Sequence, residues 1–298
     1  MLVSIVMPLY NTDIRMLEKA IDSILEQSYK EYELIIVCDR LRESSDLIVK
    51  KYAERDTRIF VIRNDCNIGL AKSLNEGIKR AKGKYIARMD ADDVSWINRI
   101  KTQVEFLENR PDVGVVFSRV RKIDETGKIL KRSSPNLTEK RILTSLFYGC
   151  LLTHPTVMIR KSALDNMPYW YCPNRKAEDY DLWTRMILND IKIAQISKVL
   201  YDYRVHSNQL SMRNKSVLSF EAIDIVYQLL LNCGISITTN EVGQYLKYMT
   251  TIEPMKNNEI KVAKDVLKRI ISNKKIEVSS YYLHRRWILM IIRRILQR

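Results

Sequence analysis

The 298-residue sequence is poor in the features of secreted, zinc-stabilised and membrane-spanning proteins. Its five cysteines are odd in number, widely spaced and include no Cys-x-x-Cys pair, which argues against a disulfide framework or a structural zinc site and fits a reducing compartment. The three histidines are too few for a multi-histidine zinc cluster. No secretory signal is visible, and no apolar run approaches the roughly 20 residues needed to span a bilayer. We therefore expect a cytoplasmic protein.

The glycine-rich nucleotide motifs are also missing. Neither G-x-x-x-x-G-K-[S/T] nor G-x-G-x-x-G occurs, which disfavours P-loop nucleotidases and dinucleotide-dependent dehydrogenases. Acidic residues are scarce relative to basic ones, 35 against 50, which gives a net charge of +15. More than half of this excess lies in residues 261–298, where eleven basic residues accompany two acidic ones. Such a tail binds a polyanion, either nucleic acid or an anionic membrane surface.

Short apolar runs alternate with helical patterns along the first 120 residues. This alternation predicts an α/β fold with a Rossmann-like, mostly parallel central sheet covered by helices. Ligands of such sheets bind beyond the carboxyl ends of the strands, so the residues that follow the strands are the candidates for a site. The predicted strands are residues 3–7, 34–37, 59–62, 85–89 and 113–117, and the predicted helices are residues 16–25, 46–54, 70–81 and 96–107.

The second half of the chain changes character near residue 210. Before it, the pattern predicts a hairpin between 120–123 and 129–131, helices at 138–147 and 178–188, and a strand at 156–159. After Ser207, long helical patterns replace the alternation. We therefore predict a catalytic-type α/β domain over residues 1–210 and a helical, basic C-terminal region over residues 211–298.

The acidic run Asp90-Ala91-Asp92-Asp93 directly follows the predicted strand at 85–89. Three carboxylates in four residues repel one another unless a cation lies among them. Their hard oxygen atoms suit Mg²⁺ or Mn²⁺ carrying a diphosphate. The same run also suits a helix start, because Asp93 or Ser95 can cap the helix that follows, although a cap needs only one of them.

Two further segments follow predicted strands. A carboxylate at Asp39 can accept a hydrogen bond from the ring N–H of a nucleobase, although polar residues at strand ends are commonly part of a turn. After the third strand, residues 67–77 enter a helix through Gly69, and this entry can place backbone N–H groups near a phosphate.

A second acidic group lies at Glu178, Asp179 and Asp181. Acids in the first turn of a helix are favoured by the helix dipole, which is a structural explanation. The functional explanation is a general base that takes a proton from an acceptor hydroxyl, and Asp179 is our choice. Downstream, Arg204 and His206 can complete a metal shell or hold a leaving phosphate, or both can be structural.

These motifs, in this order, resemble glycosyltransferase family 2, whose members are inverting enzymes of the GT-A fold. The resemblance covers roughly residues 2–211. Its matching segments are Val3–Asn11, Ser23–Tyr29, Asn67–Gly69, Asp90–Asp93, His154–Thr156, Glu178–Trp183 and Tyr203–His206.

Residue by residue, the resemblance makes Asp92 the main metal ligand and places Asp90 against ribose and metal. It makes Asp179 the catalytic base, with Glu178 and Asp181 in support. The implied nucleotide-sugar ligands are Pro8, Tyr10, Asn11, Asp39, Asn67, Gly69, Lys72, Arg88, Asp90 and Ala91, and the implied metal ligands are Asp90, Asp92 and His206.

The chain departs from the family beside the nucleobase, where Pro8, Tyr10 and Asp39 are expected. A Gly-Ser pair usually follows the nucleobase aspartate, whereas here Arg40 follows Asp39, so we expect this loop to be built differently. Polymerising members carry a Gln-x-x-Arg-Trp motif and several membrane spans. The nearest string, at residues 283–287, lacks the glutamine, which favours a single-addition enzyme.

We therefore predict an inverting, Mn²⁺- or Mg²⁺-dependent hexosyl transferase that uses a nucleotide-diphosphate sugar, UDP-hexose in our expectation. The predicted acceptor is a lipid-linked glycan or a polysaccharide of cell-surface glycan biosynthesis. Two alternatives remain: a GT-A-like nucleotidyltransferase, and a non-catalytic basic protein that binds nucleic acid or membrane. Against nucleic acid, the positive charge is terminal and the presumed functional face is acidic.

The tail from Lys261 to Arg298 alternates aromatic and aliphatic residues with arginines. A helix of this composition can lie on an anionic leaflet, which predicts a peripheral location on the inner face of the cell membrane. The structural alternative is a packed C-terminal helix with a solvated basic edge.

Overall fold

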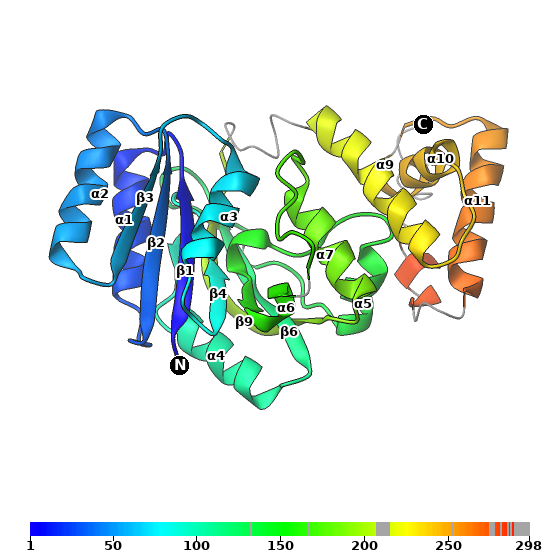
Figure 1. Cartoon of the computed structure of the whole chain (residues 1–298). Coiled ribbons are helices and arrows are strands. Elements are labelled where there is room, and N and C mark those ends of the chain that lie inside the picture. Colours follow the sequence, from blue (N-terminus) through cyan, green and yellow to red (C-terminus); the bar gives the residue numbers. More distant parts are fainter. Residues whose placement is uncertain are drawn as a thin grey trace.

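A computed structural model describes residues 1–131, 133–165, 167–206, 215–251, 253–273, 278–280, 282–284, 286 and 288. The chain folds as a twisted sheet flanked by helices, and the C-terminal helices extend the molecule on one side (Figure 1). No helix within these residues is long and apolar enough to cross a membrane.

The sheet has nine strands in the order β3-β2-β1-β4-β8-β6-β9-β5, and β7 pairs with β6. Strands β1, β2, β3 and β4 are parallel neighbours, and β6 and β9 form a second parallel pair. The remaining strands pair antiparallel, so the sheet is mixed but mostly parallel. The strands are β1 Val3–Leu9, β2 Tyr32–Asp39, β3 Ile59–Asn64, β4 Tyr85–Arg88, β5 Val94–Ser95, β6 Val113–Ile123, β7 Ile129–Lys131, β8 Met158–Arg160 and β9 Lys192–Arg204.

The alternation of side chains along β1 feeds two hydrophobic cores, one on each face of the sheet. Ile5 and Met7 belong to the cluster that includes residues of α1, α2 and α4, whereas Val6 belongs to the cluster that begins at α3 and continues through α5 and α7 to the C-terminal helices. The helices are α1 Ile14–Leu25, α2 Glu43–Arg55, α3 Leu70–Arg80, α4 Arg99–Asn109, α5 Glu139–Ser145, α6 Ser162–Asp165, α7 Glu178–Leu188, α9 Lys215–Asn232, α10 Thr239–Thr250 and α11 Asn257–Ser272, with the short helix η1 at His154–Thr156.

Most predicted elements are present, but several details of the sequence-based prediction are wrong. The strand expected at 156–159 is β8 at Met158–Arg160, preceded by η1, and the strand expected at 113–117 continues to Ile123. Strand β9 was not predicted. The helix expected from residue 96 begins at Arg99, after β5, and neither Asp93 nor Ser95 caps it, since its N-cap is Asn98. Helix α2 begins at Glu43 rather than residue 46 and has no side-chain cap.

The C-terminal helices share a core with the sheet. Buried residues of α9, α10 and α11 belong to the same hydrophobic cluster as the residues of α7, so this region packs onto the α/β part. The predicted boundary near residue 210 falls on residues 207–214, outside the described chain, and it stays a prediction. Part of the predicted membrane-binding segment, residues 261–298, also lies outside it, namely residues 274–277, Tyr281, Arg285, Trp287 and residues 289–298.

Candidate functional site

The candidate site begins where three neighbouring parallel strands end. Strand β1 lies between β2 and β4, with Leu9 beside Cys38 and Val6 beside Arg88. The segments that follow these strands therefore leave the sheet at the same edge. They carry three groups of predicted residues: Tyr10 and Asn11, Asp39, and Asp90 to Asp93.

The acidic turn after β4 brings three carboxyl groups together. One oxygen each from Asp90, Asp92 and Asp93 lies within 4.8 Å of the others. Strand β9 holds the turn from the side: the Tyr201 hydroxyl accepts a hydrogen bond from the Asp90 backbone at 3.2 Å, and Asp93 accepts one from the backbone N–H of Arg204 at 2.6 Å. Three converging hard oxygen donors form a set that Mg²⁺ or Mn²⁺ prefers, so the residues present fit such an ion.

Charge within this turn is only partly balanced. The guanidinium of Arg88 forms an ion pair with Asp90 at 2.6 Å. Burial and the charge of Asp92 nevertheless raise the pKa of Asp90, and burial together with Asp92 and Asp90 raises the pKa of Asp93 well above its ordinary value. A divalent cation among the oxygens would relieve this repulsion.

His206 lies at the edge of the same cluster, as the sequence predicted. Its Nε2 is 2.9 Å from Oδ2 of Asp92. This hydrogen bond raises the pKa of the imidazole, with a further contribution from the charge of Asp92. The structure therefore joins His206 to the predicted main metal ligand.

A buried arginine that the sequence analysis missed fixes the end of β4. Arg99 is fully buried, and its guanidinium donates to the carbonyl oxygen of Arg88 at 2.6 Å and to Oε1 of Gln103 at 3.0 Å. It also lies 5.0 Å from the ring centre of Tyr201. Burial lowers the pKa of Arg99 to about 10, so the cation persists at neutral pH.

The second acidic group opens helix α7 as predicted. Glu178 is 6% exposed, and burial followed by the charge of Asp179 raises its pKa to about 8. Burial also raises the pKa of Asp179, whose Oδ1 accepts the backbone N–H of Tyr180 at 2.7 Å. A carboxyl group with a raised pKa and partial exposure is suited to exchanging a proton with a substrate.

A histidine that the sequence analysis left without a role stands beside Glu178. Nδ1 of His154 is 3.8 Å from the Glu178 carboxyl, and Nε2 is 2.8 Å from the Tyr171 hydroxyl. Burial, with Arg88 nearby, lowers the pKa of His154 well below its ordinary value. His154 lies in the matched His-Pro-Thr segment, whereas no sequence pattern indicated Tyr171.

Asp181, predicted as a supporting residue, contacts arginines. Its two carboxyl oxygens lie 3.1 Å from Arg175 and 2.8 Å from Arg185, and the Arg185 guanidinium also donates to the carbonyl oxygens of Tyr169 and Trp170. These contacts fasten α7 to the segment that precedes it. The role that the contacts support is thus structural.

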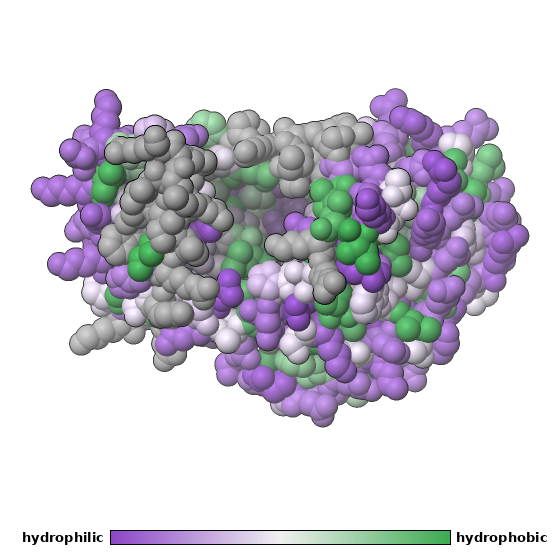
Figure 2. All heavy atoms as spheres, turned by 180° about the vertical axis from the view of Figure 1, so that it is seen from behind, coloured by the Kyte–Doolittle hydropathy of each residue, from purple (hydrophilic) through white to green (hydrophobic). Residues whose placement is uncertain are grey.

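Arg88 links the two acidic groups electrostatically. Burial raises the pKa of Asp90, Glu178 and Asp179, and the positive charge of Arg88 opposes this rise at all three. The charge of Asp90 adds to the rise at Glu178. The acidic turn and the start of α7 therefore act on one region. The face shown in Figure 2 is hollowed near its middle, with hydrophobic side chains beside the hollow.

The predicted nucleotide side is built around Asp39, which is 3% exposed. Its carboxylate accepts hydrogen bonds from the backbone N–H groups of Ile68 at 2.8 Å and Gly69 at 2.9 Å, and from Asn64 at 3.1 Å. Gly69 has a φ of +85° at the start of α3, a conformation that favours glycine. The structure thus brings Asp39 and the 67–69 segment together.

The other predicted nucleotide ligands surround this loop. Tyr10 is 51% exposed, and Asn67 and Lys72 are also exposed, so all three are accessible to a ligand. The loop after Asp39 is indeed built without a glycine, because Arg40 itself adopts a φ of +56°. Pro8 lies within β1, and Ala91 is buried within the acidic turn.

Comparisons with known proteins agree with this architecture. The model of a family described as Glycosyl transferase family 2 matches residues 4–167. An uncharacterized glycosyltransferase of Methanocaldococcus jannaschii is 38% identical over 73% of this chain and 76% of its own length. The putative glycosyltransferase EpsE of Bacillus subtilis is 36% identical over 76% of this chain and 81% of its own. The O-antigen biosynthesis glycosyltransferase WbnJ of Escherichia coli is 33% identical over 74% and 84%.

Solved structures show the same fold at low identity. S. aureus TarS residues 1–349, in complex with UDP-GlcNAc, superpose with a TM-score of 0.66 at 18% identity, covering 99% of this chain and 89% of that one. The mannosyltransferase PcManGT of Pyrobaculum calidifontis, in complex with GDP-Man and Mn²⁺, gives a TM-score of 0.57 at 14% identity, covering 99% and 87%. The GT-A fold predicted from the resemblance is thereby confirmed, and the chain belongs to glycosyl transferase family 2.

Proposed function

We propose that this glycosyltransferase is an inverting, metal-dependent enzyme that transfers one hexose from a nucleotide-diphosphate sugar to a hydroxyl of a lipid-linked or polysaccharide acceptor. The observation that carries the proposal is the pairing of two acidic groups around Arg88. One is a three-carboxylate turn, and the other is a partly exposed carboxyl group at the start of α7.

Asp90 and Asp92 would hold the metal, with Asp93 and His206 beside them. When bound, Mn²⁺ or Mg²⁺ supplies positive charge that stabilises the leaving diphosphate. A solved relative holds Mn²⁺ together with GDP-Man, which supports this proposal. Arg88 and Arg99 keep the turn in place, one through its ion pair with Asp90 and the other through the backbone of β4.

Asp179 would accept the proton of the acceptor hydroxyl as that oxygen attacks the anomeric carbon. Attack on the face opposite the diphosphate inverts the anomeric centre, so a donor in the α configuration gives a β linkage. Because its pKa is raised, Asp179 is a stronger base than an ordinary aspartate once ionised. Its partial exposure leaves it accessible to the acceptor.

The donor and the pathway are proposed from the relatives. TarS binds UDP-GlcNAc and PcManGT binds GDP-Man, and an Asp39 carboxylate would accept a ring N–H from either base. We choose a UDP-hexose, since TarS has the higher TM-score of these two. The E. coli relative acts in O-antigen biosynthesis, which supports a role in cell-surface glycan assembly.

The proposal is tested by replacing one carboxylate in each acidic group. Asp92→Asn and Asp179→Asn are each expected to lower turnover about 100-fold or more, whereas Asp190→Asn is the control. Asp190 is exposed and has a φ of +58°, which asparagine also adopts, so the control changes a charge without strain. Nucleotide release from a panel of nucleotide sugars is measured with Mn²⁺, Mg²⁺ or EDTA. Full turnover in both site variants, or in EDTA, would refute the mechanism.

A further inference from the structure

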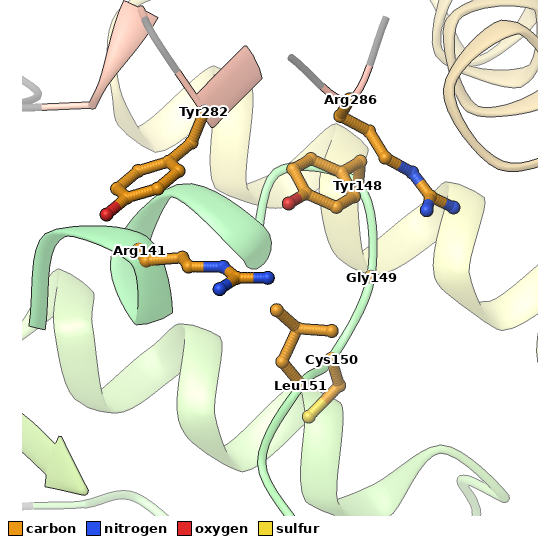
Figure 3. Close-up of a pocket in the computed structure, with 7 residues that line it drawn as sticks. All are labelled: Arg141, Tyr148, Gly149, Cys150, Leu151, Tyr282 and Arg286. Atoms are coloured by element: carbon orange, nitrogen blue, oxygen red, sulfur yellow. The ribbon is translucent and has the colours of Figure 1, made fainter. Parts of the chain in front are cut away.

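A pocket outside the acidic site lies where α5 and the segment after it meet the C-terminal region. Its volume is 310 Å³, within the range of pockets that hold small ligands. Arg141 and Tyr148 line it from the α5 side, residues 149–151 line its floor, and Tyr282 and Arg286 line it from the C-terminal side (Figure 3).

The lining is cationic and aromatic, and it includes no acidic residue. Within the described chain, neither Arg141 nor Arg286 forms an ion pair with a carboxylate. Arg286 donates from Nε to the carbonyl oxygen of Met249 at 2.9 Å, and Arg141 makes a long 3.5 Å contact with the carbonyl oxygen of Asn136. Two guanidiniums without a carboxylate partner among the described residues therefore border the pocket, which attracts an anion.

Tyr148 stands between the two arginines. In Figure 3 its hydroxyl points toward the guanidinium of Arg141, and Arg286 lies on the other side of its ring. The Arg286 guanidinium carbon is 5.8 Å from the centre of that ring, and the Arg141 guanidinium carbon is 5.7 Å from the ring centre of Tyr282. Burial raises the pKa of Tyr148 while both arginines lower it, so both charges act on this hydroxyl, which remains a hydrogen-bond donor at neutral pH.

The floor of the pocket reaches the proposed catalytic helix. Cys150 lines the pocket, and burial followed by the negative charge of Asp179 raises the pKa of its thiol. The Tyr180 hydroxyl, one residue after Asp179, donates to the carbonyl oxygen of Leu146 at 2.5 Å, which ties α7 to the end of α5. The pocket therefore borders the contact between α5 and α7, close enough to Asp179 for that charge to act on Cys150.

We propose that the pocket binds a phosphate group of the acceptor and so positions the acceptor hydroxyl near Asp179. The Arg141 guanidinium lies on the side to which the Tyr148 hydroxyl points, so its forked N–H groups and that hydroxyl suit phosphate oxygens, and Arg286 adds positive charge from the other side of the ring. The tyrosine rings and Leu151, which is 38% exposed, offer apolar surface to the attached sugar or lipid. This inference rests on the proposed transferase function and adds the chemical class of the acceptor.

Binding can be followed at one backbone amide inside the pocket. Tyr148-Gly149 is the single Tyr-Gly pair in the sequence, so labelling tyrosine carbonyl carbon and glycine nitrogen gives one NMR signal, that of the Gly149 amide. Inorganic phosphate and diphosphate are titrated into the full chain in EDTA, with acetate as the monoanion control. We expect a saturable movement of this signal with phosphate or diphosphate at concentrations where acetate has little effect.

Variants identify the groups responsible. Arg141→Ala is expected to weaken the phosphate-dependent movement by on the order of 10- to 100-fold, and Arg141→Lys less, because lysine keeps the charge without the fork. Tyr148→Phe removes only the hydroxyl and should also weaken the movement; in this variant phenylalanine carbonyl carbon is labelled in place of tyrosine, because no other phenylalanine precedes a glycine in the sequence. The matched control is Arg80→Ala, which removes an exposed arginine at the end of α3. The guanidinium carbon of Arg80 lies 5.0 Å from the ring centre of Phe60 on β3. No movement in the wild type, equal movement with acetate, or unchanged binding in Arg141→Ala would overturn the proposal.

Two ligand sources share this chemistry, and a further pair of titrations separates them. A short prenyl diphosphate represents a lipid-linked acceptor, and a glycerol phosphodiester represents a phosphate-containing polymer; the tighter ligand at Gly149 identifies the source. In parallel, metal-dependent hydrolysis of the donor is measured for the wild type and for the control Arg80→Ala, which should retain it. A wild type without hydrolysis would count against the transferase function, whereas a Gly149 signal insensitive to every phosphate ligand counts against the pocket.

Discussion

The buried carboxyl group of Glu178 should make the protein less stable as the pH rises. Its pKa is about 8 in the folded protein, against an ordinary value of 4.5, because burial and the charge of Asp179 disfavour ionisation. The folded state therefore keeps a proton that the unfolded state loses above pH 4.5. Since the unfolded state binds fewer protons across this interval, the free energy of unfolding falls from about pH 4.5 to about pH 8 and then levels.

The magnitude follows from the width of the interval. At about 1.4 kcal/mol per pH unit, a rise in pKa from 4.5 to about 8 corresponds to about 5 kcal/mol at full ionisation and about 3 kcal/mol at pH 7. Glu178→Gln has nearly the same shape and no ionisable group, so it escapes this loss. We expect the variant to be more stable than the wild type by about 3 kcal/mol at pH 7 and by little near pH 4.5.

The measurement is urea unfolding of both proteins in EDTA at several pH values between 5 and 8.5. The quantity of interest is the difference in unfolding free energy between variant and wild type. His154, whose pKa is lowered by burial, stabilises the folded state as pH rises, but it does so in both proteins and largely cancels in the difference. A difference that does not grow with pH would refute the assignment of Glu178 as a protonated, buried group.

Two further predictions concern packing and location. Gly77→Ala would place a Cβ 2.4 Å from Cγ1 of Val6, so it should destabilise the protein by about 1–3 kcal/mol. At Gly243 the nearest atom to such a Cβ is 3.6 Å away, so alanine there should stabilise helix α10 by about 0.5–1 kcal/mol. Thermal unfolding compares the two variants, and equal shifts in melting temperature would contradict the packing argument. The full chain should sediment with anionic vesicles, because the basic residues among 261–298 supply the attraction, and it should do so more weakly at high salt. Absence of binding at low salt would refute the membrane proposal.

The elements that sequence patterns predicted are those with a simple local pattern of apolar residues. Strand β1 was found because it is a short, nearly continuous apolar run, and helix α7 because its apolar residues recur every three to four positions. Strand β9 was missed because its pairing with β6 shifts register around Ser118 and Arg119, so two consecutive exposed residues, Ser197 and Lys198, interrupt the alternation. The start of α4 was misplaced because β5 pairs with β9, a tertiary contact that no local pattern contains.

The candidate site divides in the same way. Carboxylates that follow strands were recognisable from residue type and position, and Asp90, Asp92 and His206 do lie together. The groups that hold them were not recognisable. Arg99, 11 residues after Arg88 in the sequence, reads as an ordinary basic residue of a helix, and only the fold shows that it binds the carbonyl oxygen of Arg88. Partners of this kind are set by tertiary contacts rather than by local sequence.

The position of the acidic turn explains why a cation is favoured there in addition to the guanidinium of Arg88. From β1 the sheet is built outward through β2 and β3 on one side and then through β4 on the other, so the strand order reverses between β1 and β4, a point where ligands of open α/β sheets commonly bind. Beyond Arg88 the chain leaves the sheet, and strand β9 holds it through Tyr201 and Arg204.

Around this point, burial raises the pKa of four carboxyl groups, those of Asp90, Asp93, Glu178 and Asp179. Arg88 contacts only the first of them directly. Arg88 and Arg99 supply two positive charges near these four carboxyl groups, so the remaining negative charge is balanced by bound protons or by another cation. A divalent ion carrying a diphosphate would lower the pKa of Asp90 and Asp93, so metal binding should tighten as the pH rises, which titration with Mn²⁺ at several pH values measures.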